Sequence, residues 1–252
     1  MFVYGFSDSL NLASHTIEYD FADYETYETN TISINKEIAV NDNVLLGEYL
    51  ETEYRNFEYF PTYSYQGESG RFGVDETGKL AFYSTDIYTT SDYRTKEECV
   101  QYAVDFLNSI YDISDYTIEV RDYSDLGLYD IYFTKYIDGV ETTDSACVSI
   151  NYDGSLHGYH SFMFGRVSKD IDISEINFEK TNELVIEKLD TVYEQAKKIY
   201  DEVKYGKPNV LLTTLKDGKT GLIYWLDVDC INNYGEMQRV LSERINMVVV
   251  ID

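Results

Sequence analysis

The chain has 252 residues, and 44% of them are hydrophobic, which is enough for one large domain or a few small ones and argues against disorder. Its formal net charge is −26, and the acidic excess is greatest in residues 1–90, with 16 acidic and 4 basic residues. Such a surface repels nucleic-acid phosphates and anionic lipid headgroups, so the charge argues against nucleic-acid and membrane-surface partners. It favours basic proteins, cationic peptides or divalent cations, or it only keeps an exposed surface solvated.

Three cysteines are too few for a disulfide framework. Cys99 and Cys230 fall on the apolar sides of a predicted helix and strand, where cysteine behaves as a small hydrophobe. Cys147 alternates with Ser149 and Asn151 and is expected to face outward.

No run of about 18 apolar residues occurs, so the sequence predicts no direct membrane insertion. Residues 1–8 lack the basic and apolar segments of a secretory signal. Two expectations stay open: a cytoplasmic protein, or an exported one whose signal or anchor is absent from this segment.

The N-terminal region mixes polar residues with short apolar alternations. Asp42 is placed to cap a short helix with Val44, Leu45, Tyr49 and Leu50, although Gly47 weakens it. From residue 59 to 84, three β-rich stretches separated by glycine-containing turns predict a meander.

A capping box at Thr95 and Glu98 then predicts the start of a helix. Apolar residues recur at helical spacing after it, so one broad face should lie on a sheet. The predicted strands that follow are 116–123, 128–137, 146–152 and 156–164.

The same order recurs towards the C-terminus. Thr181 or Asn182 is expected to cap a second helix that extends to Val203, after a linker at 168–179. Strands are predicted at 210–215, 222–231 and 245–251. In the middle strand, Trp225, Asp227 and Asp229 alternate with apolar residues, which predicts a one-sided sheet.

The repeated order of helix and strands predicts an α+β fold of tandem small units, each an antiparallel sheet covered by one helix. A β-rich stretch ending in Asp-Gly or a close variant recurs at 71–80 and 147–156, and is cut off at 247–252. The expected parts are an acidic, β-rich region or degenerate unit at 1–90, a first unit at 91–167 and a second unit at 178–252.

These residues resemble PepSY repeats. The resemblance rests on the capped helix 97–107, the hairpin around Asp138-Gly139, and the strand 148–152 that runs into Asp153-Gly154-Ser155-Leu156. Residues 74–80 resemble the closing strand of a further repeat and 184–252 a diverged one, so the similarity covers roughly residues 70–252.

The resemblance implies small α+β domains, often in tandem, in bacterial secreted, lipid-anchored or envelope proteins. The family is often associated with protease propeptides or with restraint of peptidases, and it brings no catalytic residues to this chain. No peptidase module accompanies the repeats here.

The sequence predicts no metal site and no cofactor. His157 and His160 are three residues apart on a predicted strand, which sends their rings to opposite faces. The carboxylates of Asp20, Asp23 and Glu25 provide oxygen atoms of the kind that bind calcium. No twelve-residue calcium-binding loop is present, however, so a solvated acidic face is favoured over a calcium site.

The 26 tyrosines suit either an ordinary sheet surface or a recognition face for peptide or glycan. The candidate binding residues are Tyr129, Tyr132, Trp225, Asp227 and Asp229.

The leading functional hypothesis is a non-catalytic binding or regulatory module that contacts a protein or peptide in the bacterial cell envelope. Its expected location is extracellular or in the envelope, with the cytoplasm as the alternative. Two further functions stay open: a hydrolase acting on glycan or peptide through unidentified carboxylates, and an acidic decoy that occupies a basic nucleic-acid-binding protein.

Overall fold

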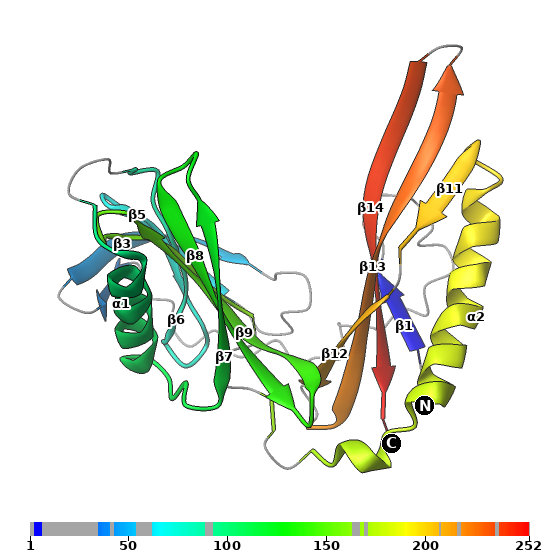
Figure 1. Cartoon of the computed structure of the whole chain (residues 1–252), viewed down its shortest axis with the longest axis horizontal. Helices are drawn as coiled ribbons and strands as arrows, with labels where there is room; N and C mark the ends of the chain where they lie inside the picture. The colour runs from blue at the N-terminus through cyan, green and yellow to red at the C-terminus, as the bar shows by residue number, and fades with distance from the viewer. Residues whose placement is uncertain are drawn as a thin grey trace. The chain divides into compact units, whose positions relative to one another are not determined.

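The computed structural model describes residues 3–6, 35–40, 43–53, 62–88, 93–162, 167–168, 171–206, 208–215, 218–234 and 237–251. Within these ranges two α-helices occur and strands predominate, so the expected α+β class is confirmed (Figure 1). The chain forms two compact units: residues 26–167, and residues 1–25 together with 168–252.

The 26–167 unit is an antiparallel sheet with one helix, α1 (Lys96–Asn108). The strand order is β2-β3-β4-β5-β6-β10-β9-β8-β7, so two meanders meet where β6 pairs with β10. The strands are β2 (Asn35–Val40), β3 (Asn43–Glu53), β4 (Thr62–Gly67), β5 (Gly70–Val74), β6 (Leu80–Ser84), β7 (Tyr116–Tyr123), β8 (Leu128–Ile137), β9 (Val140–Asn151) and β10 (Leu156–Phe162).

The meander predicted between residues 59 and 84 is present as β4, β5 and β6. The prediction of a helix after Asp42 is wrong, because β3 occupies that stretch and pairs with β2 and β4. Leu45 is buried between exposed Val44 and Leu46, so the exposure has the period of a strand. Cross-strand pairing therefore overrides the helical spacing of a few apolar residues; Asp42 itself lies outside the described residues.

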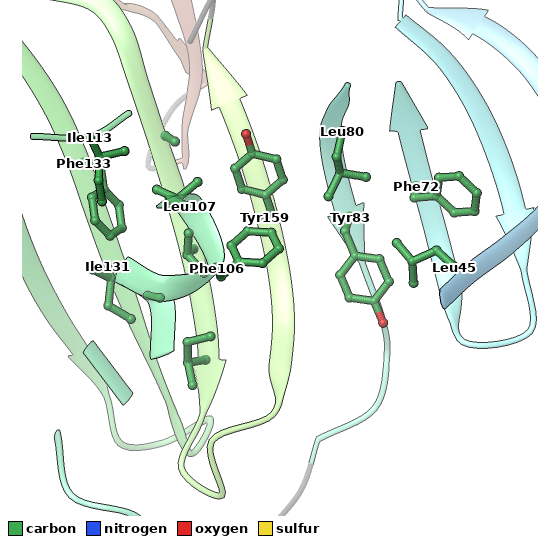
Figure 2. Close-up of a cluster of buried hydrophobic side chains, with 14 of the residues drawn as sticks. Leu45, Phe72, Leu80, Tyr83, Phe106, Leu107, Ile113, Ile131, Phe133 and Tyr159 are labelled. Atoms are coloured by element: carbon green, nitrogen blue, oxygen red, sulfur yellow. The ribbon is translucent and has the colours of Figure 1, made fainter. Parts of the chain in front are cut away.

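Helix α1 begins as predicted. The backbone N–H of Glu98 donates to Thr95 Oγ1 (3.2 Å), and the backbone N–H of Thr95 donates to Glu98 Oε2 (2.8 Å). Phe106 lies edge-on to Tyr159 of β10, with ring centroids 5.2 Å apart (Figure 2). The remaining fully buried residues of the helix are Cys99, Ala103 and Leu107, so this face fixes α1 on the sheet.

Strands β7 and β8 have the bounds that the sequence predicts. Strand β9 begins at Val140 rather than Ala146. The cause is the tight turn at Asp138-Gly139, where φ is 46° and 83°, because two left-handed residues allow the strands to pair immediately on both sides.

The other unit is an antiparallel sheet with helix α2 (Phe178–Ala196). In it β13 pairs with β11, β12 and β14, and β14 also pairs with β1. Its remaining elements are β1 (Val3–Phe6), the 3-10 helix Ile173–Glu175, β11 (Glu202–Tyr205), β12 (Asn209–Thr214), β13 (Thr220–Tyr234) and β14 (Met237–Val250). Neither helix in the described residues is both long enough and apolar enough to cross a membrane.

Helix α2 differs from the prediction at both ends. Its N-cap is Asn177, whose side-chain oxygen accepts the backbone N–H of Lys180 (3.0 Å), so the expected linker contains the helix start. Thr181 is instead buried within the first turns, next to the Tyr224 hydroxyl (2.9 Å). Val203 does not continue the helix, because it pairs opposite Cys230 in the sheet.

One pattern of turn hydrogen bonds occurs three times among the described residues. In each case the first residue's N–H donates to the carbonyl four residues later, and a glycine N–H donates back to the first residue's carbonyl, at 2.8–2.9 Å. The bonds join residues 75, 78 and 79, residues 151, 154 and 155, and residues 215, 218 and 219, with Gly78, Gly154 and Gly218 at φ of 82°, 88° and 84°. The stretch at 247–251 belongs instead to β14 and the residue after it, and Asp252 lies outside the described residues.

The first two turns lie in the two complete copies of the β-rich stretch that ends in Asp-Gly or a close variant, at 71–80 and 147–156. The third turn joins β12 to β13. Residues on both sides of position 90 share the sheet of the 26–167 unit. The division into separate repeat units at 1–90, 91–167 and 178–252 stays a prediction.

Candidate functional site

Three tyrosine rings gather at one end of the 26–167 unit. Tyr129 is near the start of β8, Tyr152 directly follows β9, and Tyr93 precedes the cap of α1. The centroid of Tyr152 lies 4.8 Å from that of Tyr129 and 5.6 Å from that of Tyr93, with tilted planes. We call these three residues the tyrosine cluster.

The turn after β9 fixes Tyr152. Asp153 Oδ1 accepts the backbone N–H (2.8 Å) and the hydroxyl (2.7 Å) of Ser155, which closes the turn. The backbone N–H of Tyr152 itself donates to the carbonyl of Gly127 (2.9 Å). The ring is therefore held between two turns rather than at the end of a free loop.

The segment before α1 is attached to the same turn. The backbone N–H of Arg94 donates to the Tyr152 carbonyl (2.7 Å), and Arg94 Nε donates to the Asp153 carbonyl (3.0 Å). Gly154 leaves room for this contact, since a Cβ there would lie 2.6 Å from Arg94 Cδ. This attachment positions Tyr93, the residue before Arg94, beside the Tyr152 ring although its own side chain is 71% exposed.

Asp122 completes the site. It lies on β7 directly opposite Tyr129, and the Tyr152 hydroxyl donates to its Oδ1 (2.5 Å). This bond to the carboxylate raises the pKa of Tyr152 to about 12, since it stabilises the protonated hydroxyl. Burial, followed by the Asp122 charge, also raises the pKa of Tyr129. Both phenols are therefore neutral at physiological pH beside a carboxylate.

Tyr132 lies on the opposite face of β8 and does not join the cluster. Arg121 lies over its ring, 4.4 Å from the centroid, and Arg121 Nε also pairs with Glu119 Oε1 (2.9 Å). The Tyr132 hydroxyl is 3.4 Å from Asp130 Oδ2, and Asp130 Oδ1 accepts the Ser149 hydroxyl (2.6 Å). Burial raises the pKa of Tyr132.

Cys147 lies across from Tyr132 on β9, on the face away from the core, as its alternation predicts. It is half-buried there rather than fully outward-facing. Burial, followed by the charge of Asp130, raises the pKa of the Cys147 thiol to about 12. The thiol is therefore protonated at neutral pH and is a poor nucleophile.

The other three candidate residues belong to the other unit, on β13. The Tyr224 hydroxyl contacts Thr181 and Asn182 of α2, so alternate residues of β13 face the helix, and Trp225, Asp227 and Asp229 face away from it. The predicted alternation is thus confirmed between residues 224 and 230, where the even-numbered residues are buried. Asp229 Oδ1 accepts the Ser242 hydroxyl (2.6 Å), Asp227 is exposed, and Trp225 is half-buried.

His157 and His160 are half-buried on β10. His157 Nδ1 lies 3.2 Å from the Ile87 carbonyl, and the ring is 4.5 Å from that of Tyr88. Within the part of the chain that the structure describes, no three His, Cys, Asp or Glu side chains are close enough to share a metal ion. The acidic group Asp20, Asp23 and Glu25 falls outside that part.

Comparison with known proteins gives one structural similarity. The C-terminal domain of YpeB from Bacillus megaterium aligns with 94% of this chain and 98% of its own, at 14% identity and a TM-score of 0.40. No protein-family model matches the sequence, and no curated protein matches it.

Sequence reasoning named Tyr129 as a candidate binding residue but did not name the residues that contact it. The Asp122–Tyr129 pair follows from the turn at 125–127, since a hairpin register that joins 123 to 128 also joins 122 to 129. Tyr152 could have been placed at the sheet end from the Asp153-Gly154 turn. The position of Tyr93 depends on contacts between residues far apart in the sequence, which no local pattern reveals.

Proposed function

We propose that this chain is a non-catalytic binding or regulatory module that contacts a protein or peptide. The observation that carries the proposal is the tyrosine cluster: three rings held together at one end of a sheet, one of them 71% exposed. Tyrosine has a large, rigid and amphipathic side chain, so it provides contact area on binding with little loss of conformational entropy.

Bonds within the chain hold the site together. Backbone hydrogen bonds from Tyr152 and Arg94 fix the two segments that carry the outer rings, and Asp122 holds the Tyr152 hydroxyl. A preformed site binds more tightly than a disordered one, because fewer side chains must be ordered when the partner arrives.

One nucleophilic side chain near the candidate residues, the thiol of Cys147, is not activated for catalysis. Its raised pKa keeps it protonated, and its neighbours Ser149 and Asp130 bond to each other. This group therefore behaves as a packed polar part of the sheet and not as an activated nucleophile.

We further propose that the chain consists of tandem PepSY-like units and acts outside the cytoplasm, at the bacterial cell envelope. The resemblance of the sequence to PepSY repeats supports this location. The turn that recurs at 75–79, 151–155 and 215–219 supports the repeat organisation, because each copy joins two antiparallel strands with the same hydrogen bonds and a left-handed glycine.

The test is a comparative pull-down from bacterial envelope extract, with bound proteins identified by mass spectrometry. The immobilised wild-type chain is compared with the double variant Tyr93→Ala/Tyr152→Ala. The matched control is Tyr136→Ala, because Tyr136 is an exposed tyrosine at the other end of β8. Far-UV circular dichroism confirms that each variant is folded.

We expect the wild-type chain and the Tyr136 variant to enrich the same proteins and the double variant to lose them. The proposal fails if the wild-type chain enriches nothing above a blank resin, or if the double variant retains every enriched protein.

A further inference from the structure

Rings elsewhere in this chain carry a cation supplied by the chain itself. Arg121 lies over Tyr132 at 4.4 Å, Lys79 over Tyr111 at 4.7 Å, and Lys197 over Tyr193 at 4.0 Å from the ring centroid. A cation over an aromatic face is attracted by the negative face of the ring quadrupole. These tyrosines thus already have the partner that their faces attract.

The tyrosine cluster differs in this respect. Among the described residues, no lysine or arginine lies over the rings of Tyr93, Tyr129 or Tyr152. The nearby Arg94 is directed by its Nε to the Asp153 carbonyl, and its stem lies against Gly154. The three rings of the tyrosine cluster are therefore not paired with a cation from the described part of the chain.

The cluster has a carboxylate neighbour that can attract a cation, Asp122, in addition to the positively charged Arg94. Asp122 is exposed, and within the described residues it forms no ion pair. Its Oδ1 accepts the Tyr152 hydroxyl, but a carboxylate can accept several hydrogen bonds, so Oδ2 remains able to accept from a ligand.

We propose that the tyrosine cluster, with Asp122, binds a lysine or arginine side chain in a basic segment of the partner protein. The cation lies over the faces of the rings, and the Asp122 carboxylate neutralises its charge. This inference rests on the proposed function and names the chemistry of the partner: a basic peptide segment, attracted to a chain whose net charge is −26.

The test uses three synthetic octapeptides with blocked ends, which alternate glycine with arginine, citrulline or glutamate. Citrulline has nearly the shape of arginine without its charge. Isothermal titration calorimetry measures the affinity of each peptide for the full chain at low and high salt. We expect the arginine peptide to bind most tightly, and its affinity to fall as salt is added.

Two variants locate the site, each with a matched control. Tyr93→Leu and Asp122→Asn should each weaken binding of the arginine peptide by about threefold or more, the range expected for one cation–ring or ion-pair contact. Tyr136→Leu and Asp138→Asn remove an exposed ring and an exposed charge at the other end of β8, so they should change the affinity by less than about twofold.

The inference is overturned if the citrulline peptide binds as tightly as the arginine peptide, if none of the peptides binds, or if the control variants weaken binding as much as the cluster variants. If envelope proteins are still captured through the cluster in the pull-down, these results do not contradict the proposed function. If the pull-down also fails, the proposed function fails with the inference.

Discussion

Two tyrosines on the same strand, Tyr129 and Tyr132, differ in what surrounds them. The ring of Tyr132 is covered by Arg121, and its hydroxyl is near Asp130, so this part of the sheet is satisfied within the chain. Tyr129 packs instead against Tyr152, in a cluster to which the described part of the chain supplies no cation. The comparison teaches that the partners of a tyrosine, and not its exposure alone, decide whether it is available for binding.

The largest expected effect concerns the core that supports the cluster side of the sheet. Phe106 is fully buried against Tyr159, so Phe106→Ala should lower the free energy of unfolding by about 3–5 kcal/mol through lost burial and a residual cavity. Urea denaturation followed by circular dichroism measures this. Asp105→Ala, an exposed change on the same helix, should cost about 0.5 kcal/mol or less. Equal losses in the two variants would contradict the described core.

A smaller change should disturb the cluster and spare the Tyr132 side. Gly154 has a φ of 88°, and a Cβ would meet Arg94, so Gly154→Ala should destabilise the unit by about 1–2 kcal/mol. The ring signals of Tyr93 and Tyr152 should shift in NMR spectra while those of Tyr132 stay in place. The control is Gly206→Ala, since nothing lies within 4 Å of a Cβ at that position. A shift of Tyr132 as large as that of Tyr152 would show that the two sides are not independent.

The helix cap near the cluster should have a further, smaller effect. Thr95→Ala removes the side-chain acceptor for the Glu98 N–H and should cost about 1 kcal/mol, whereas Thr95→Ser should retain most of it. If both substitutions cost the same, the cap is not formed in solution.

The same cap predicts a dependence on pH. The Thr95 N–H bonded to the Glu98 carboxylate lowers the pKa of Glu98 below its ordinary value of 4.5. A lowered pKa in the folded state means that the stabilisation is complete above pH 4.5 and is lost as the pH falls through the lowered value. Glu98→Gln should therefore flatten this part of the stability profile, measured as the urea midpoint against pH, and an unchanged profile would contradict the bond.

The smallest expected effect on stability concerns Tyr132, the tyrosine whose ring is covered by Arg121. Arg121→Ala uncovers the Tyr132 ring and breaks an exposed ion pair with Glu119, so it should lower stability less than the preceding substitutions do. The arginine octapeptide should then perturb the Tyr132 ring signal, which it leaves unchanged in the wild-type chain. If the signal is perturbed equally with and without Arg121, the intramolecular cation does not protect this ring.

Local patterns in the sequence predict much of this fold. The Thr95–Glu98 capping box, the strands β7 and β8 and the Asp138-Gly139 turn each depend on residues close together in the chain. Errors arise where tertiary pairing decides between two local options. Residues 43–53 have some helical spacing but pair with β2 and β4, and Val203 extends a helical stripe but pairs with β13.

The candidate site was less accessible from the sequence. Tyr129 was chosen as a tyrosine on a strand, and the same criterion chose Tyr132, although strand alternation alone places the two residues on opposite faces. The cluster depends on the bond from Arg94 to Tyr152, which joins the segment before α1 to a turn far along the chain. A pattern within a single segment carries no information about such a contact.

The most direct test of the account is an NMR titration of the full chain, with tyrosine rings labelled with carbon-13, using the arginine octapeptide. The account predicts that the ring signals of Tyr93, Tyr129 and Tyr152 shift together and saturate at one affinity, while those of Tyr132 and Tyr136 do not move. Shifts that spread evenly over exposed tyrosines, or that leave the cluster signals unchanged, would contradict the claim that this cluster is a binding site.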